Sequence, residues 1–91
     1  LRADAARLAE HRARAIRLLQ QIGPQDPDFG RAAELLALAF EQEGHHDLAA
    51  RQLERRLELL APGESAPALE LHLAELLEET QEYGRALEVL Q

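Results

Sequence analysis

Few side chains in this chain of 91 residues could carry out covalent chemistry. The aliphatic hydroxyl groups belong to Ser65 and Thr80, both at predicted helix ends, and we interpret Ser65 as a capping residue because no histidine or acid is expected beside it. The sequence has no cysteine, and its ten basic residues are all arginine. A thiolate metal site, a disulfide and a Schiff-base lysine are therefore excluded. We expect no catalytic residues and no enzymatic activity.

The two adjacent histidines come closest to a metal site in residue type. His45 and His46 follow Glu41 and Glu43, but neighbouring residues at a helix start point about 100° apart, and no third histidine lies four residues away. We interpret the two histidines as a pair in a turn. The five glycines stand singly at predicted helix boundaries, so the sequence lacks a glycine-rich phosphate loop. We expect neither a metal nor a cofactor.

The net charge of −7 is distributed unevenly along the chain. Residues 1–22 carry five arginines against two acids, a net charge of +3, whereas residues 64–91 carry seven glutamates against one arginine, a net charge of −6. Such opposite ends favour head-to-tail self-association, although simple solvated faces would give the same distribution. The arginines of the first segment lie at several angles around its helix without aromatic neighbours, so we expect no nucleic-acid binding. They are Arg2, Arg7, Arg12, Arg14 and Arg17.

Leucine and alanine supply most of the apolar residues, since 46% of the chain is hydrophobic but only 3% is aromatic. Both are strong helix formers, and the β-branched residues that favour strands are nearly absent. No apolar run approaches the roughly 20 residues that cross a bilayer, so we expect no membrane insertion. A chain of this length suits one small domain. The prediction is a single all-α domain over residues 1–91.

Helical periodicity, with punctuation by glycine and proline, divides the chain into about five helices. The first is predicted as one long helix over residues 1–22, in which Arg12 interrupts the apolar stripe; a break near Glu10 is the alternative. The others are predicted over residues 27–43, 46–60, 66–79 and 83–91. The stripe of the first helix consists of Leu1, Ala5, Leu8, Ala15, Leu19 and Ile22.

The second and third predicted helices form a hairpin around Gly44. Asp26 is expected to cap the second helix, with Pro27 in its first turn. Small alanines on both helices should let the two axes approach closely. The expected buried residues are Ala33, Leu36, Ala37 and Phe40 on the second helix, Ala49, Ala50, Leu53, Leu57 and Leu60 on the third, Leu69, Leu73, Ala74, Leu76 and Leu77 on the fourth, and Ala86, Leu87 and Leu90 on the fifth.

A pattern in this hairpin recurs further along the chain. A Leu-Ala pair is followed by an alanine 13 residues after the leucine, and the whole pattern repeats at an offset of 37 residues. The first copy has Leu36, Ala37, Phe40, His46, Ala49, Leu53, Leu59 and Pro62, and the second has Leu73, Ala74, Leu77, Tyr83, Ala86 and Leu90. These residues resemble the tetratricopeptide repeat, a helix pair of about 34 residues. Arg56 departs from the pattern, because it replaces the second small residue.

The resemblance implies a TPR-like α-solenoid segment of about five helices stacked as antiparallel pairs. Residues 1–29 would then be a long helix and loop from a partial preceding repeat, residues 30–66 a repeat, and residues 67–91 a truncated repeat. In this family the first helix of each pair forms the concave face. The corresponding positions here are Arg31, Glu34, Leu38, Glu41 and Gln42, and Leu71, His72, Glu75, Glu78 and Glu79.

The function implied by this resemblance is protein–protein interaction, as a scaffold or adaptor segment of a longer array. Glutamates dominate the expected concave face, so we expect its groove to bind a peptide or helix of basic or mixed charge, with Leu38 and Leu71 as apolar contacts. One alternative is a regulatory or sensory helical domain attached to a transcription factor or enzyme, which would need a ligand pocket between helices. Another is a scaffold for envelope secretion or assembly.

Overall fold

The chain folds as a series of α-helices. The structure, a computed structural model, describes residues 2–80 and 88–90. Its helices are α1 (Arg2–Gln20), α2 (Phe29–Gln42), α3 (His46–Glu58) and α4 (Pro67–Glu79), and residues 88–90 are also helical. These described residues contain no strand. The all-α prediction is confirmed, and the first segment is one helix rather than two.

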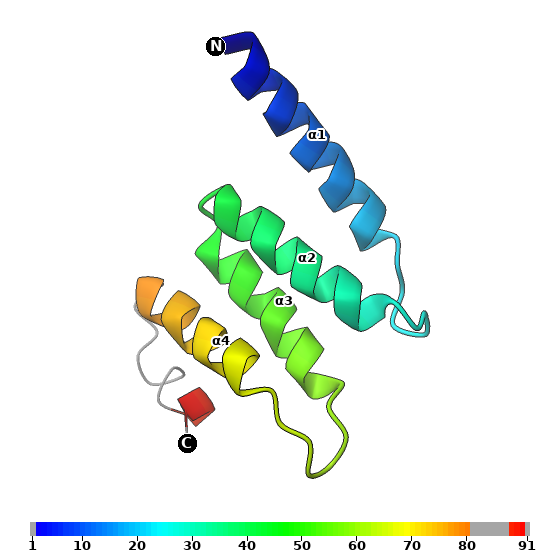
Figure 1. Cartoon of the computed structure of the whole chain (residues 1–91), viewed down its shortest axis with the longest axis vertical. Helices are drawn as coiled ribbons and strands as arrows, with labels where there is room; N and C mark the ends of the chain where they lie inside the picture. The colour runs from blue at the N-terminus through cyan, green and yellow to red at the C-terminus, as the bar shows by residue number, and fades with distance from the viewer. Residues whose placement is uncertain (1, 81–87, 91) are drawn as a thin grey trace.

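Successive helices run antiparallel to one another (Figure 1). In the described part of the chain, α3 packs between α2 and α4, whereas α1 packs against α2 alone. Most of the fifth predicted helix, with Ala86 and Leu87, lies outside the described residues. Leu90 was predicted to be buried on this helix, which is wrong: Leu90 is exposed, and the neighbouring Val89 packs against the core.

The segment between α1 and α2 forms a turn before the helix begins. The Asp26 side chain does not cap the helix; its Oδ1 accepts a hydrogen bond from the backbone N–H of Asp28 at 2.8 Å. This local turn competes with helical geometry, so α2 begins at Phe29, two residues later than predicted. At the other end Gly44 has φ +82°, and the N–H of His45 bonds back to the carbonyl of Phe40. This is the Schellman arrangement that ends a helix, as the glycine predicted.

The connection between α3 and α4 differs from the sequence-based expectation. Ser65 does not cap α4, because Ala66 occupies the N-cap position without a side-chain hydrogen bond, and Pro67 fills the first turn. The fixed φ of proline suits this position, which makes the hydroxyl cap dispensable. The loop is closed instead by Glu64, whose Oε1 accepts a hydrogen bond from the N–H of Ala61 at 2.8 Å.

The core is centred on a seam of alanines between α2 and α3. Ala37 and Ala49 are both 0% exposed, and the absence of longer side chains at these positions lets the two helices pack closely. Leucines of α4 cover the other side of α3. The buried cluster comprises Ile16, Leu36, Ala37, Phe40, Ala49, Ala50, Leu53, Leu73, Ala74, Leu76 and Leu77. The sequence predicted all of these residues except Ile16, although Leu57, Leu60 and Leu69 are only partly buried.

The helix α1 is attached to the rest of the fold by a short apolar line. Ile16 is buried, and Leu19 packs beside it against the core. The apolar stripe that predicted this helix is exposed over most of its length, since Ala5, Leu8 and Ala15 are exposed; Leu1 lies outside the described residues. The physical reason is that a helix that packs on one neighbour buries one side only, and the N-terminal part of α1 projects beyond the end of α2 (Figure 1).

The alanine seam generates a stability prediction. We expect Ala49→Leu to lower the free energy of unfolding by about 1–3 kcal/mol, because the larger side chain must force the α2 and α3 axes apart. Ala9→Leu, at an exposed position of α1, is the matched control and should change it by less than about 0.5 kcal/mol. Urea denaturation followed by circular dichroism measures both. An Ala49→Leu variant as stable as the parent would contradict close packing at this position.

Candidate functional site

The residues predicted for the concave face lie in three different environments: internal contacts, a groove between α1 and α2, and exposed helix surface. Glu34 and Glu41 form ion pairs or hydrogen bonds within the protein. Leu38 and Gln42 line a groove between α1 and α2. His72 is partly buried on α4. The remaining predicted residues are exposed on α2 or α4; they are Arg31, Leu71, Glu75, Glu78 and Glu79.

The Glu34 carboxylate is held by an arginine from the next helix. The Nε of Arg56 on α3 lies 3.0 Å from Oε2 of Glu34, and both side chains are partly exposed. Gly30 makes this contact feasible, because a Cβ added there would lie only 3.2 Å from Cδ of Arg56. The arginine stem therefore passes over α2 where a side chain is missing, and this glutamate is already paired before any partner arrives.

The second internal contact joins α2 to α4. Oε2 of Glu41 lies 2.8 Å from Nε2 of His72. The backbones of α2 and α4 do not pack directly in the described structure, so this side-chain bridge spans the gap between them. Two residues predicted for the concave face thus contact each other, so neither is free of an internal partner.

A groove runs between the exposed sides of α1 and α2, and we call it the leucine groove. Leu8, Leu18 and Leu38 are 62%, 57% and 50% exposed and all border it. Its volume is about 640 Å³. The full lining consists of Leu8, Arg12, Ala15, Leu18 and Leu19 of α1 and Leu35, Leu38, Ala39 and Gln42 of α2.

The leucine groove explains two features of the sequence of α1: its apolar stripe and the arginine that interrupts it. Leu8, Ala15 and Leu19 belong to the apolar stripe that predicted the first helix, and Arg12 interrupts this stripe. Because this side of α1 is open, the guanidinium of Arg12 can reach water while its stem covers apolar surface. Sequence reasoning missed Leu18 and Leu35 as site residues, since nothing local indicates which side of α1 remains uncovered.

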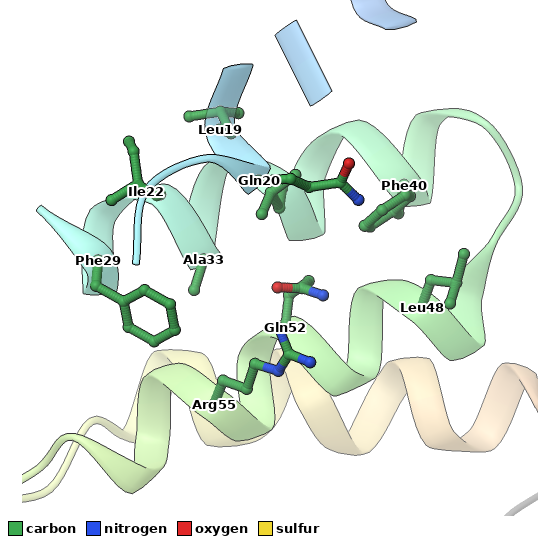
Figure 2. A pocket seen from close by; sticks show the side chains of 11 residues that line it. Leu19, Gln20, Ile22, Phe29, Ala33, Phe40, Leu48, Gln52 and Arg55 are labelled. Atoms are coloured by element: carbon green, nitrogen blue, oxygen red, sulfur yellow. The ribbon is translucent and has the colours of Figure 1, made fainter. Parts of the chain in front are cut away.

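A second opening, the polar cavity, lies where the end of α1 meets α2 and α3. Its volume is about 400 Å³. Apolar residues such as Phe29, Leu36 and Phe40 form much of its wall, and Figure 2 shows Gln52 and Arg55 of α3 extending toward it, with Gln20 of α1 opposite. Gln52 is only 9% exposed, although the described residues offer its amide no hydrogen bond.

The residues considered for catalysis or metal binding lie apart from these openings. Ser65 is exposed, and the hydroxyl of Thr80 donates a hydrogen bond to the carbonyl of Leu77 at 2.9 Å. His45 is exposed and precedes α3, whereas His46 is its first residue. Over residues 2–80 and 88–90, no three potential metal ligands come together. No helix in that described part combines the length and apolar character needed to span a membrane.

Comparison with known proteins adds no family to this picture. No protein-family model, no curated protein and no solved structure matches the chain. The resemblance to the tetratricopeptide repeat therefore remains a prediction based on the spacing of its leucines and alanines. A function for the chain has to be inferred from the geometry of its own surfaces.

The bridge between Glu41 and His72 is expected to make a small contribution to stability. In a double-mutant cycle with Glu41→Ala and His72→Ala, we expect a coupling energy of about 0.2–1 kcal/mol, because both side chains are partly exposed to solvent. The matched cycle pairs His72→Ala with Glu43→Ala, an exposed glutamate beyond the end of α2, and should show no coupling. Equal coupling in the two cycles would argue against a specific interaction between Glu41 and His72.

Proposed function

We propose that this chain is a protein–protein interaction module, a scaffold or adaptor segment that holds an α-helix of its partner in the leucine groove. The observation that carries the proposal is the convergence of Leu8, Leu18 and Leu38 on one groove while each remains half exposed or more. Contiguous exposed apolar surface of this kind marks interaction sites in soluble proteins. The resemblance to a repeat family that binds peptides and helices supports the same class of function.

The dimensions of the leucine groove suit a helix. Its α1 side extends from Leu8 to Leu19, which corresponds to roughly 16 Å or three helical turns. Two antiparallel helices form its walls, so a third helix can place its apolar ridge between them as in ordinary helix packing. Burying the exposed part of each leucine would contribute about 1 kcal/mol. The groove thus offers enough apolar surface for a reversible interaction.

The acidic face predicted from the resemblance supports a weaker competing site. Two of its glutamates, Glu34 and Glu41, already have partners within the chain. The acids that remain, Glu75, Glu78 and Glu79, accompany only one exposed leucine on α4, Leu71. A basic peptide could bind there through charge, but it would find little apolar surface to bury.

A second candidate function is regulation by a small molecule, supported by the polar cavity. Its volume falls within the range of ligand pockets, and it combines an apolar wall with a few polar groups. The amide of Gln52 faces this cavity and makes no hydrogen bond to the described residues, so it is available to bind a ligand. Gln52 and Arg55 would bind a carboxylate while Phe29 and Leu36 contact an apolar body.

The leucine groove is tested with a neutral helical peptide. The probe is a fluorescently labelled peptide of about 14 residues. It has leucines at positions i, i+3, i+7 and i+10 and alanine and glutamine elsewhere. Fluorescence anisotropy should show binding that Leu18→Ser or Leu38→Ser weakens by at least about tenfold. The folded state should survive because both leucines are half exposed or more, which circular dichroism checks.

The matched control for these variants is Leu71→Ser, since Leu71 is 53% exposed but lies on α4 outside the groove. It should leave the affinity for the neutral peptide unchanged within about twofold. A loss with Leu71→Ser and none with Leu38→Ser would place the site on α4. No binding of the peptide at all would refute the proposed function.

The polar cavity is tested with octanoate as the probe, because it joins a carboxylate to an apolar chain. In NMR titrations of the ¹⁵N-labelled protein, we expect the amide shifts of residues 48–55 to change with octanoate and not with octanol. Gln52→Leu should abolish the response and leave the free energy of unfolding nearly unchanged, because the amide faces the cavity and makes no hydrogen bond to the described residues that the substitution would break. Shifts that octanol reproduces would exclude recognition of the carboxylate.

A further inference from the structure

An unpaired arginine lies in the lining of the leucine groove. Arg12 lies within the groove lining and is partly buried. The ion pairs of the described residues do not include it. A half-buried guanidinium without a counter-ion is a favourable position for an incoming carboxylate, because a charge pair there is less screened than one on the open surface.

Two glutamates beside the opposite edge of the groove already make contacts within the protein. Glu34 and Glu41 lie on α2 next to the turns that carry Leu35 and Leu38, and they are paired with Arg56 and His72. Arg31, one turn before Leu35, is exposed and forms no ion pair with a described residue. The α2 side therefore adds a further unpaired positive charge rather than a negative one.

The wider surface of α1 has the same sign. From residue 4 onward the helix carries four arginines against two acids, a net charge of +2. One of the acids, Asp4, lies on the groove side, one turn before Leu8, so the positive charge is concentrated from Arg7 onward. At the groove itself the unpaired positive charges are those of Arg12 in the lining and Arg31 beside it, although the whole chain is acidic.

From this charge distribution we infer the chemistry of the partner: an amphipathic helix of about three turns, with a leucine-type ridge flanked by glutamates or aspartates. The ridge fills the space between Leu8, Leu18 and Leu38, and an acidic side chain at its edge pairs with Arg12. This inference rests on the proposed function, since it specifies which helix the groove accepts. It assigns the groove a preference opposite to that expected for the acidic face of α4.

A second copy of this chain fits the groove poorly. Its acidic helix α4 buries Leu73, Leu76 and Leu77 in its own core and exposes only Leu71, so it offers no continuous apolar ridge. Two copies cannot dock through their leucine grooves without bringing the unpaired arginines together, which is unfavourable. The partner is therefore a different protein with an acidic amphipathic helix.

Three peptides that share the leucine ridge of the neutral probe separate charge from shape. Their non-ridge positions are glutamate in one, glutamine in the second and lysine in the third. At about 50 mM salt we expect the acidic peptide to bind about tenfold more tightly than the basic one, and the ratio should fall to about threefold or less at about 500 mM salt because the charges are screened. Equal affinities at low salt, or tighter binding of the basic peptide, would overturn the inference.

Two arginine variants locate the source of the preference. Arg12→Gln should remove most of the difference between acidic and basic affinities, because it removes the charge inside the groove and leaves only that of Arg31 beside it. Arg17→Gln is the matched control, since Arg17 lies nine positions after Leu8 and thus on the opposite side of α1; it should retain most of the ratio. Equal losses in the two variants would show that the net charge of α1, and not a contact with Arg12, produces the preference.

Self-association is the remaining outcome, and sedimentation velocity tests it. We expect a monomer at concentrations of about 100 µM, since α4, the acidic helix of the described part of the chain, offers no continuous apolar ridge to the groove. A dimer that Leu38→Ser dissociates would make a second copy the occupant and would overturn the inference. The two proposals fail separately: loss of neutral-peptide binding refutes the interaction function, whereas neutral binding without a charge preference refutes only the assignment of an acidic partner.

Discussion

The close contact between alanines of α2 and α3 is the constraint on which the rest of the fold depends. Ala37 and Ala49 are completely buried, and their short side chains allow the two helices to pack closely. With α3 held at this distance, Leu53 lies in the common core with leucines of α4. The chain has very few aromatic residues, so short distances must replace large side chains as the source of dense packing.

The contact between Arg56 and Gly30 shows how the same constraint is met where the sequence pattern fails. The repeat pattern expects a small residue at position 56, and a large charged residue stands there. Its stem lies against Gly30, and its Nε reaches Glu34 at 3.0 Å. A close helix contact needs the small residue on only one of its two sides. Here α2 provides it, so the departure from the pattern is compatible with a tight α2–α3 pair.

The sequence predicted the features that depend on neighbours along the chain. The hairpin at Gly44, its alanine seam and the buried leucines of α4 follow from periodicity and from helix-ending residues, and the structure confirms them. The sequence did not predict that Glu34 pairs with Arg56 or that Glu41 pairs with His72. These partners lie 22 and 31 residues away along the chain. Nor could it predict the open side of α1, since the same leucines would be buried if another helix covered them. The leucine groove is thus a property of packing rather than of local pattern.

The leucine groove and the polar cavity share one lining residue, Leu19. It packs with Ile16 as the apolar line that attaches α1 to the core, so the openings lie on either side of this attachment. A helix in the groove and a ligand in the cavity would both contact α1 near this line. If occupation of one site changes the position of α1, it must change the affinity of the other, and thermodynamic linkage makes that effect equal in both directions. In that case α1 would connect the proposed interaction function to the proposed regulatory one.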